Sequence, residues 1–181
     1  MMKKGLSPVI ATVLLILVTI AGVSLISSFI IPFVKDSLKS TDCLQFRDYF
    51  SFEEDFGYNC YDSDGRHGVS IKKSSGDSGS ENIVGLDLVL KGDTTSIKVN
   101  VRNGDVVSCL AEGIYMLGEP CSSLIDVPGI GNYSAITYIY NSSKGNYKKA
   151  EVYPVIKGGK ICEMSDSIKL NPCKPEINLT T

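Results

Sequence analysis

The longest uncharged stretch of the chain lies near its N-terminus and limits what the chain can fold into. The 29 residues from Leu6 to Val34 contain no Asp, Glu, Lys, Arg or His, and Lys4 and Lys35 flank them. A helix rises about 1.5 Å per residue, and the hydrocarbon core of a bilayer is about 30 Å thick. The run is therefore long enough to span a membrane as one helix, with residues to spare.

The ends of this run predict where its helix begins and ends. Ser7 is a favourable N-cap, and Pro8 then occupies the first helical position, where its missing N–H costs nothing. Pro32 is expected to kink or end the helix, because the residue before a proline avoids helical geometry. A removed secretory signal is a poorer interpretation, since its apolar core has only about 7–15 residues. The lysines before the run place the N-terminus in the cytoplasm and everything after Val34 outside.

A basic and a small residue, Lys4 and Gly5, precede the sequence Leu6-Ser7-Pro8-Val9-Ile10. This arrangement resembles the N-terminus of archaeal type IV pilins, in which a prepilin peptidase removes a short basic leader, the class III signal peptide. The resemblance implies cleavage between Gly5 and Leu6, which leaves the helix on the mature chain. Bacterial pilins usually carry Glu at the fifth mature position, where this chain has Ile10, so the archaeal branch is favoured.

The resemblance also implies a function for the apolar helix. Pilin helices first lie in membrane lipid and then pack against copies of themselves or other pilins in a filament core. Residues 6–34 would do both here, in a structural subunit of a surface filament used for adhesion or attachment to an unknown surface ligand. Ala21, Ser24 and Ser28 recur at i, i+3 and i+7, which permits close helix approach, although small residues are common in any membrane helix.

Two other interpretations of the chain remain open. In the first, the helix is a single-pass membrane anchor, and the exported part is a binding module that does not polymerise. In the second, the protein is a minor pilin that primes or caps filaments. The chain then divides into a leader (1–5), a transmembrane or filament-core helix (6–34), a linker (35–42) and an extracellular domain (43–181).

The exported domain is expected to be all-β. Ile83–Leu90 is apolar and Thr95–Val101 alternates, which predicts two strands joined by a turn at residues 91–93. Asn103-Gly104 predicts a tight turn into a third strand over Val106–Leu110. Further strands are expected within 43–61 and at 69–73, 133–140, 147–156 (a pair interrupted by Pro154), 161–164 and 167–170. Seven to ten short strands are typical of a β-sandwich, and the pilin resemblance implies an immunoglobulin-like form.

All six cysteines lie beyond the helix: Cys43, Cys60, Cys109, Cys121, Cys162 and Cys173. An even number confined to the exported part indicates disulfides. Six cysteines allow 15 pairings, which the sequence alone does not resolve. The hypothesis adopted is local pairing, Cys43–Cys60, Cys109–Cys121 and Cys162–Cys173, with each bridge closing a loop of roughly 12–18 residues.

Three N-x-S/T sequons begin at Asn132, Asn141 and Asn178. On an exported chain they are candidate N-glycosylation sites, and they would lie in surface loops if used.

We find no motif that predicts catalysis, a metal or a cofactor. The single histidine, His67, is expected in a loop, and there is no C-x-x-C for zinc or redox chemistry. Asp62-Ser63-Asp64-Gly65 is similar to the start of a calcium loop, but the later Glu is absent, so we interpret it as a turn. The formal net charge is −2, and we expect no nucleic-acid partner and no enzymatic activity.

Overall fold

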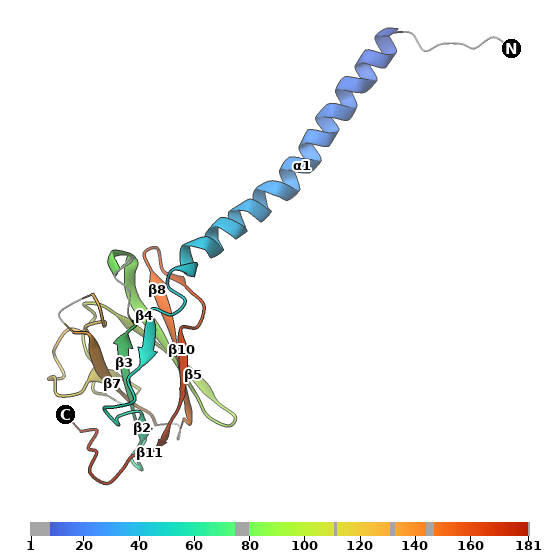
Figure 1. The fold of residues 1–181 in the computed structure, drawn as a ribbon. Helices are drawn as coiled ribbons and strands as arrows, with labels where there is room; N and C mark the ends of the chain where they lie inside the picture. The colour runs from blue at the N-terminus through green and yellow to red at the C-terminus, as the bar shows by residue number, and fades with distance from the viewer. Residues whose placement is uncertain (1–7, 75–79, 111, 131–132, 144–146, 181) are drawn as a thin grey trace. The chain divides into compact units, whose positions relative to one another are not determined.

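The computed structural model describes residues 8–74, 80–110, 112–130, 133–143 and 147–180. The chain divides into two compact units, residues 1–42 and 43–181, of which the first holds most of the helix and the second is a strand-rich domain (Figure 1). In chain order the elements are α1 (Pro8–Leu44), β1 (Phe50–Phe52), β2 (Cys60–Tyr61), β3 (Arg66–Lys73), the short 3-10 helix η1 (Ser80–Asn82), β4 (Ile83–Lys91), β5 (Ser96–Arg102), β6 (Ile114–Met116), β7 (Ala135–Asn141), β8 (Lys149–Ile156), β9 (Lys160–Ile161), β10 (Asp166–Lys169) and β11 (Asn171–Pro172).

The helix α1 begins at Pro8, as predicted, but it ends ten residues later than the apolar run. It has 37 residues and continues through Pro32 and through 35–42, where the polar composition predicted a linker. After Pro32 the chain contains no Gly or Pro until Gly57, so no strong helix breaker interrupts this extension. The expectation that Pro32 ends the helix is therefore wrong.

The first sheet has the strand order β11-β2-β3-β7-β6, and β1 also pairs with β3. Its centre is the antiparallel pair β3–β7, whose register runs from Arg66↔Asn141 to Lys72↔Ala135. The short strand β11 pairs in parallel with β2, and brings the C-terminal segment beside the start of the domain.

The second sheet has the order β10-β8-β4-β5, with β9 also pairing with β8. The predicted hairpin over 83–101 is confirmed as β4 and β5. Pro154 does not divide 147–156 into two strands, because β8 is continuous. The partner of β8 changes near Pro154, from β10 at residues 149–152 to β9 at 155–156. The Pro154 carbonyl accepts from the Cys162 N–H, so the missing N–H faces the gap between β10 and β9.

One hydrophobic core serves both sheets. Val69 and Ile71 of β3, Leu88 of β4 and Val152 of β8 are all fully buried and belong to the same cluster. The Phe52 N–H of β1 also donates to Asp166 Oδ2 of β10 at 2.9 Å, and so joins the two sheets. The chain is therefore one apolar helix followed by a strand-rich domain with a shared core.

The expected strand over Val106–Leu110 does not form. Val106 makes a single bridge to Leu124, and the Val107 N–H donates to the Ser123 carbonyl at 3.0 Å. Gly104, at φ +85°, likewise donates to the Ile125 carbonyl. The segment after β5 therefore pairs with residues 123–125 and does not return along β5.

Candidate functional site

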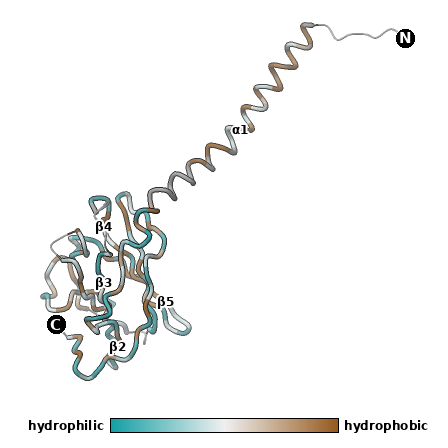
Figure 2. The backbone as a smooth tube through the Cα atoms, in the orientation of Figure 1, coloured by the Kyte–Doolittle hydropathy of each residue, from teal (hydrophilic) through white to brown (hydrophobic). Residues whose placement is uncertain are grey.

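The surface of α1 is the largest unpartnered apolar surface in the described part of the molecule. The stretch Val9–Ser28 has a mean hydropathy of 2.8, and none of it is buried within the chain. Figure 2 shows hydrophobic colouring along much of this helix. Such a helix can cross a membrane or act as a signal sequence.

Four hydroxyl groups on this surface are satisfied within the helix itself. Four hydroxyls donate to backbone carbonyls three or four residues earlier, and they belong to Thr12, Thr19, Ser24 and Ser28. Bonds of this kind let a hydroxyl enter an apolar environment without an unpaired donor. The residues Ala21, Ser24 and Ser28 thus form a small-residue stripe that is compatible with lipid and with another helix.

The last two residues of α1 belong to the β-domain unit, and one of them is joined covalently to the strands. Cys43 forms a disulfide with Cys162, which follows β9. The adjoining segment is buried as well: Phe46 is 1% exposed, and its carbonyl accepts from Ser165 Oγ at 3.2 Å. The chain that leaves the helix is therefore fixed to the segment between β9 and β10.

Two of the three predicted disulfide pairings are wrong. The structure has Cys43–Cys162, Cys60–Cys173 and Cys109–Cys121, so only the last of these was among the predicted local pairs. The sequence separations of the first two are 119 and 113 residues. Strand pairing explains the second of these, because β11 lies parallel to β2 and brings Cys173 to Cys60. Three disulfides indicate an oxidising, extracellular environment for the domain.

The other predicted site residues are only partly described. Gly5, Leu6 and Asn132 lie outside the described residues. Asn141 is the last residue of β7. Asn178 lies in the C-terminal segment after β11.

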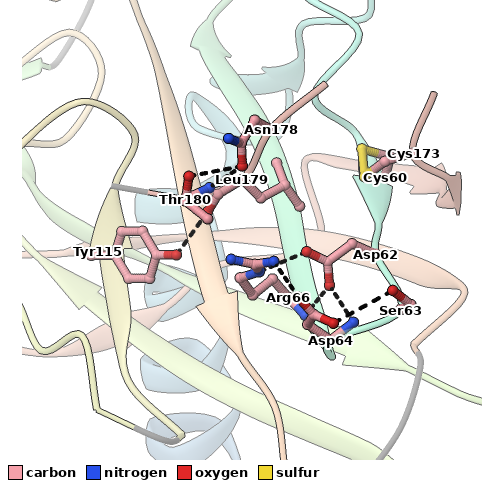
Figure 3. A network of polar contacts seen from close by, with 10 residues as sticks. All are labelled: Cys60, Asp62, Ser63, Asp64, Arg66, Tyr115, Cys173, Asn178, Leu179 and Thr180. Carbon is pink, nitrogen blue, oxygen red and sulfur yellow. Dashed lines mark hydrogen bonds and ion pairs between the residues drawn. A yellow bond between two sulfur atoms is a disulfide. The ribbon is translucent and has the colours of Figure 1, made fainter. Parts of the chain in front are cut away.

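The loop at Asp62 is a turn, as predicted. Asp62 Oδ1 accepts from the backbone N–H groups of Asp64 and Arg66, at 2.9 Å each. The Arg66 side chain reaches both carboxylates, with Nε 2.6 Å from Asp62 and Nη2 2.6 Å from Asp64 (Figure 3). The guanidinium therefore supplies the positive charge at this cluster. Within the described residues, no group of three or more His, Cys, Asp or Glu is placed to hold a metal ion.

His67 is not in a loop, because β3 already begins at Arg66. The imidazole is fully buried, and its Nε2 accepts from the Tyr147 N–H at 2.8 Å. Burial lowers the pKa of His67 below its usual value, so the ring is neutral near pH 7. This contact fixes the chain at Tyr147, just before β8, and gives His67 a role in packing.

Two buried carboxylates on the outer face of the second sheet were not predicted from the sequence. Asp87 of β4 is 1% exposed and lies 2.7 Å from Arg102 and 3.3 Å from Lys98 of β5. Glu151 of β8 is 4% exposed and contacts two lysine ammonium groups and the hydroxyl of Tyr153. The alternation of polar and apolar residues over 149–153 places Glu151 on the face opposite the core, but it does not indicate that this face is covered there.

The surroundings of Glu151 lower the pKa of its carboxyl group strongly. Burial alone would raise its pKa, but hydrogen bonds from Lys91, Lys149 and Tyr153 outweigh burial and hold the pKa at about 2. The side chain is therefore ionised in all but very acidic solution. This ion cluster ties β4 to β8 on the face opposite the core.

A shallow apolar hollow of about 160 Å³ lies beside β6 and β7. The side chains that line it include Phe56, Met116, Leu117 and Tyr133, with Glu119 as the charged member. Its lining is mostly apolar, so it could accept a small apolar group.

Comparisons of the chain with protein-family models, with curated proteins and with solved structures found no match.

Proposed function

We propose that the protein is a structural subunit of a type IV pilus-like surface filament and assembles through its N-terminal helix. The observation that carries the proposal is the helix itself, which is apolar, unburied and longer than a bilayer needs. A prepilin peptidase would remove residues 1–5, and membrane lipid would hold the helix before assembly.

Helix length favours assembly over simple anchoring. The 27 uncharged residues from Pro8 to Val34 span about 40 Å. Placing all of them inside a hydrocarbon core of about 30 Å needs a helix tilt of about 40° from the membrane normal. Transmembrane helices in known structures tilt by only about 20° on average. Ile30, Ile31 and Val34 are exposed beyond the membrane-length window Val9–Ser28. Neighbouring copies would cover this additional apolar surface in a filament core.

The β-domain fits the external part of such a subunit. Its disulfides are those of an exported protein. In this proposal it is an immunoglobulin-like sandwich that faces outward, with the N-terminus of the precursor in the cytoplasm. The external surface to which the filament attaches would contact the β-domain.

The alternative is a single-pass anchor that carries a monomeric binding module. The hollow beside β6 and β7 favours it, because a module that captures a ligand needs such a site. In that case the chain would remain uncleaved, and its helix would hold separate copies in the membrane.

Two measurements on protein from the cells that produce it separate these functions. Intact-mass analysis should find a chain that begins at Leu6, and electron microscopy of sheared surface material should show filaments that contain it. A mature chain that begins at Met1 or Met2, together with detergent-soluble single copies, would contradict the filament proposal.

A pair of variants tests the helix surface directly. Ser24→Ile adds bulk to the small-residue stripe and should reduce filament yield at least tenfold while membrane insertion persists. Val23→Leu adds bulk on a different helix face and serves as the control, with filament yield near that of the wild type. Equal yields from both variants would argue against close packing through the stripe.

A further inference from the structure

The sequon Asn178-Leu179-Thr180 has a defined geometry in the C-terminal segment. Asn178 Oδ1 accepts two hydrogen bonds from Thr180, from its N–H at 3.0 Å and from its hydroxyl at 2.8 Å. Figure 3 shows the carboxamide with its oxygen toward Thr180 and its nitrogen turned away. Both residues are exposed, and the Asn178 Nδ2 has no hydrogen-bond partner among the described residues.

The residue between them keeps the sequon facing outward. Leu179 is 1% exposed, and its carbonyl accepts from the buried Tyr115 hydroxyl at 2.9 Å. Its side chain lies against β3 at Gly68, where an added Cβ would be 3.0 Å from Leu179 Cδ2. With Leu179 turned inward, Asn178 and Thr180 both lie on the solvent side.

The sequon at Asn141 is held in a different way. The Asn141 N–H donates to the Gly113 carbonyl at 3.1 Å, and its own carbonyl accepts from the Glu112 N–H at 2.7 Å. Ser142 is buried, and its N–H donates to the Gly65 carbonyl at 2.9 Å. The Ser143 hydroxyl, which a sequon needs, donates to Glu112 Oε1 at 2.6 Å.

An enzyme that modifies a sequon must surround the asparagine side chain and reach the hydroxyl two residues later. At Asn141 this requires the opening of at least four hydrogen bonds to other segments of the domain. At Asn178 a single hydrogen bond, from Tyr115, joins the sequon to another segment among the described residues. The hydroxyl of Thr180 already contacts the Asn178 carboxamide.

We propose that Asn178 is a site of N-linked glycosylation on the folded domain and that Asn141 is not. The donor would be an oligosaccharide joined to a lipid through a phosphate or diphosphate. The bond between the sugar C1 and the phosphate oxygen breaks, and C1 forms a bond to Asn178 Nδ2. The lipid phosphate leaves with the electron pair of the broken bond, and the nitrogen releases one proton to water.

This proposal goes beyond the filament proposal and does not depend on it. It requires only that the domain be exported, which holds equally for a filament subunit and for a membrane anchor. Electron microscopy of the same preparations reports on filaments separately, so failure of one proposal is distinguishable from failure of the other.

The test uses full-length protein from the cells that produce it. After reduction and tryptic digestion, mass spectrometry should find the peptide that begins at Leu170 carrying an added glycan mass, with fragments that place it on Asn178. Thr180→Val has nearly the same shape but no hydroxyl, and should lose the glycan. Thr180→Ser keeps the hydroxyl and should retain it.

The matched control is Asn141→Gln, which should leave the glycan mass of the intact protein unchanged. Equal thermal unfolding of the two Thr180 variants would exclude misfolding as the cause of a lost glycan. An unmodified Leu170 peptide in the wild type would overturn the proposal. So would a glycan that persists in Thr180→Val, or one found at Asn141 while Asn178 is unmodified.

Discussion

The helix and the β-domain contain the same kinds of apolar residue in opposite surroundings. Val18 of α1 is 69% exposed, whereas Ile71 of β3 is fully buried. The β-domain completes its own core and closes it with three disulfides, while the first part of α1 finds no core among the described residues of this chain. Burial of apolar surface is the main favourable term in folding. The apolar surface of the helix is therefore left uncovered by the described residues of this chain.

The largest expected effect concerns the covalent closure of the β-domain. Replacing Cys60 and Cys173 by Ser removes a bridge between residues 113 apart, which the chain-entropy model values at about 4 kcal/mol because the remaining Cys43–Cys162 bridge already shortens the loop. For a domain of this size we expect the melting temperature to fall by on the order of 15 °C. Thermal unfolding followed by circular dichroism measures the change.

The matched control replaces Cys109 and Cys121, which are 12 residues apart and whose bridge is worth about 3 kcal/mol in the same model. Its melting temperature should fall less. Peptide mapping without reduction should find Cys60 joined to Cys173. A peptide that joins Cys43 to Cys60 would contradict the long-range pairing and support the local pairs that the spacing of the cysteines indicated.

A smaller effect distinguishes two exposed apolar positions. Val18→Lys places a charge near the middle of the membrane-length window and should cost about 3 kcal/mol in membrane insertion. Leu110 of the β-domain is 77% exposed, and Leu110→Lys should leave insertion and stability nearly unchanged. The fraction of protein that remains in membranes after alkaline extraction reports the difference. Similar losses for both variants would remove the contrast between the two regions.

The smallest effect tests the ion cluster on the second sheet. Because the pKa of Glu151 is lowered to about 2, its stabilisation is present above its ordinary pKa of 4.5. That stabilisation is lost as the pH falls from 4.5 toward 2. Glu151→Gln replaces charged by neutral hydrogen bonds and should cost about 2 kcal/mol at pH 6. The difference in unfolding free energy should shrink toward pH 2 in denaturant titrations, and a difference that does not depend on pH would exclude this role.

Local patterns predicted elements that depend on near neighbours. The Ser7-Pro8 sequence placed the start of α1, an apolar run located β4, and alternation located β5 and β7 to within a few residues. The same reasoning failed where a partner decides the structure. Val106 has a strand-like neighbourhood but bridges to Leu124, and Pro154 is accommodated in a strand because no neighbour needs its N–H.

The candidate sites divide in the same way. The sequence identified the cysteines and the sequons as residue types, but strand pairing decided which cysteines meet. It also decided that Asn141 is held in β7 while Asn178 is exposed. Buried carboxylates such as Glu151 went unnoticed, because burial depends on the strands that lie beside them.

The sequence by itself determined that this protein has a long apolar helix, a cysteine-rich β-domain with the character of an exported protein, and charges that avoid the apolar run. These properties follow from the amino-acid composition and from the spacing of apolar residues along the chain. Both are local features that do not depend on the tertiary fold. The tertiary structure alone decided the disulfide pairing, the shared core of the two sheets and the exposure of the two described sequons. Those properties depend on contacts between residues far apart in the chain, by more than a hundred positions for two of the disulfides. Such contacts are set by how strands pair and pack and leave little trace in the local sequence.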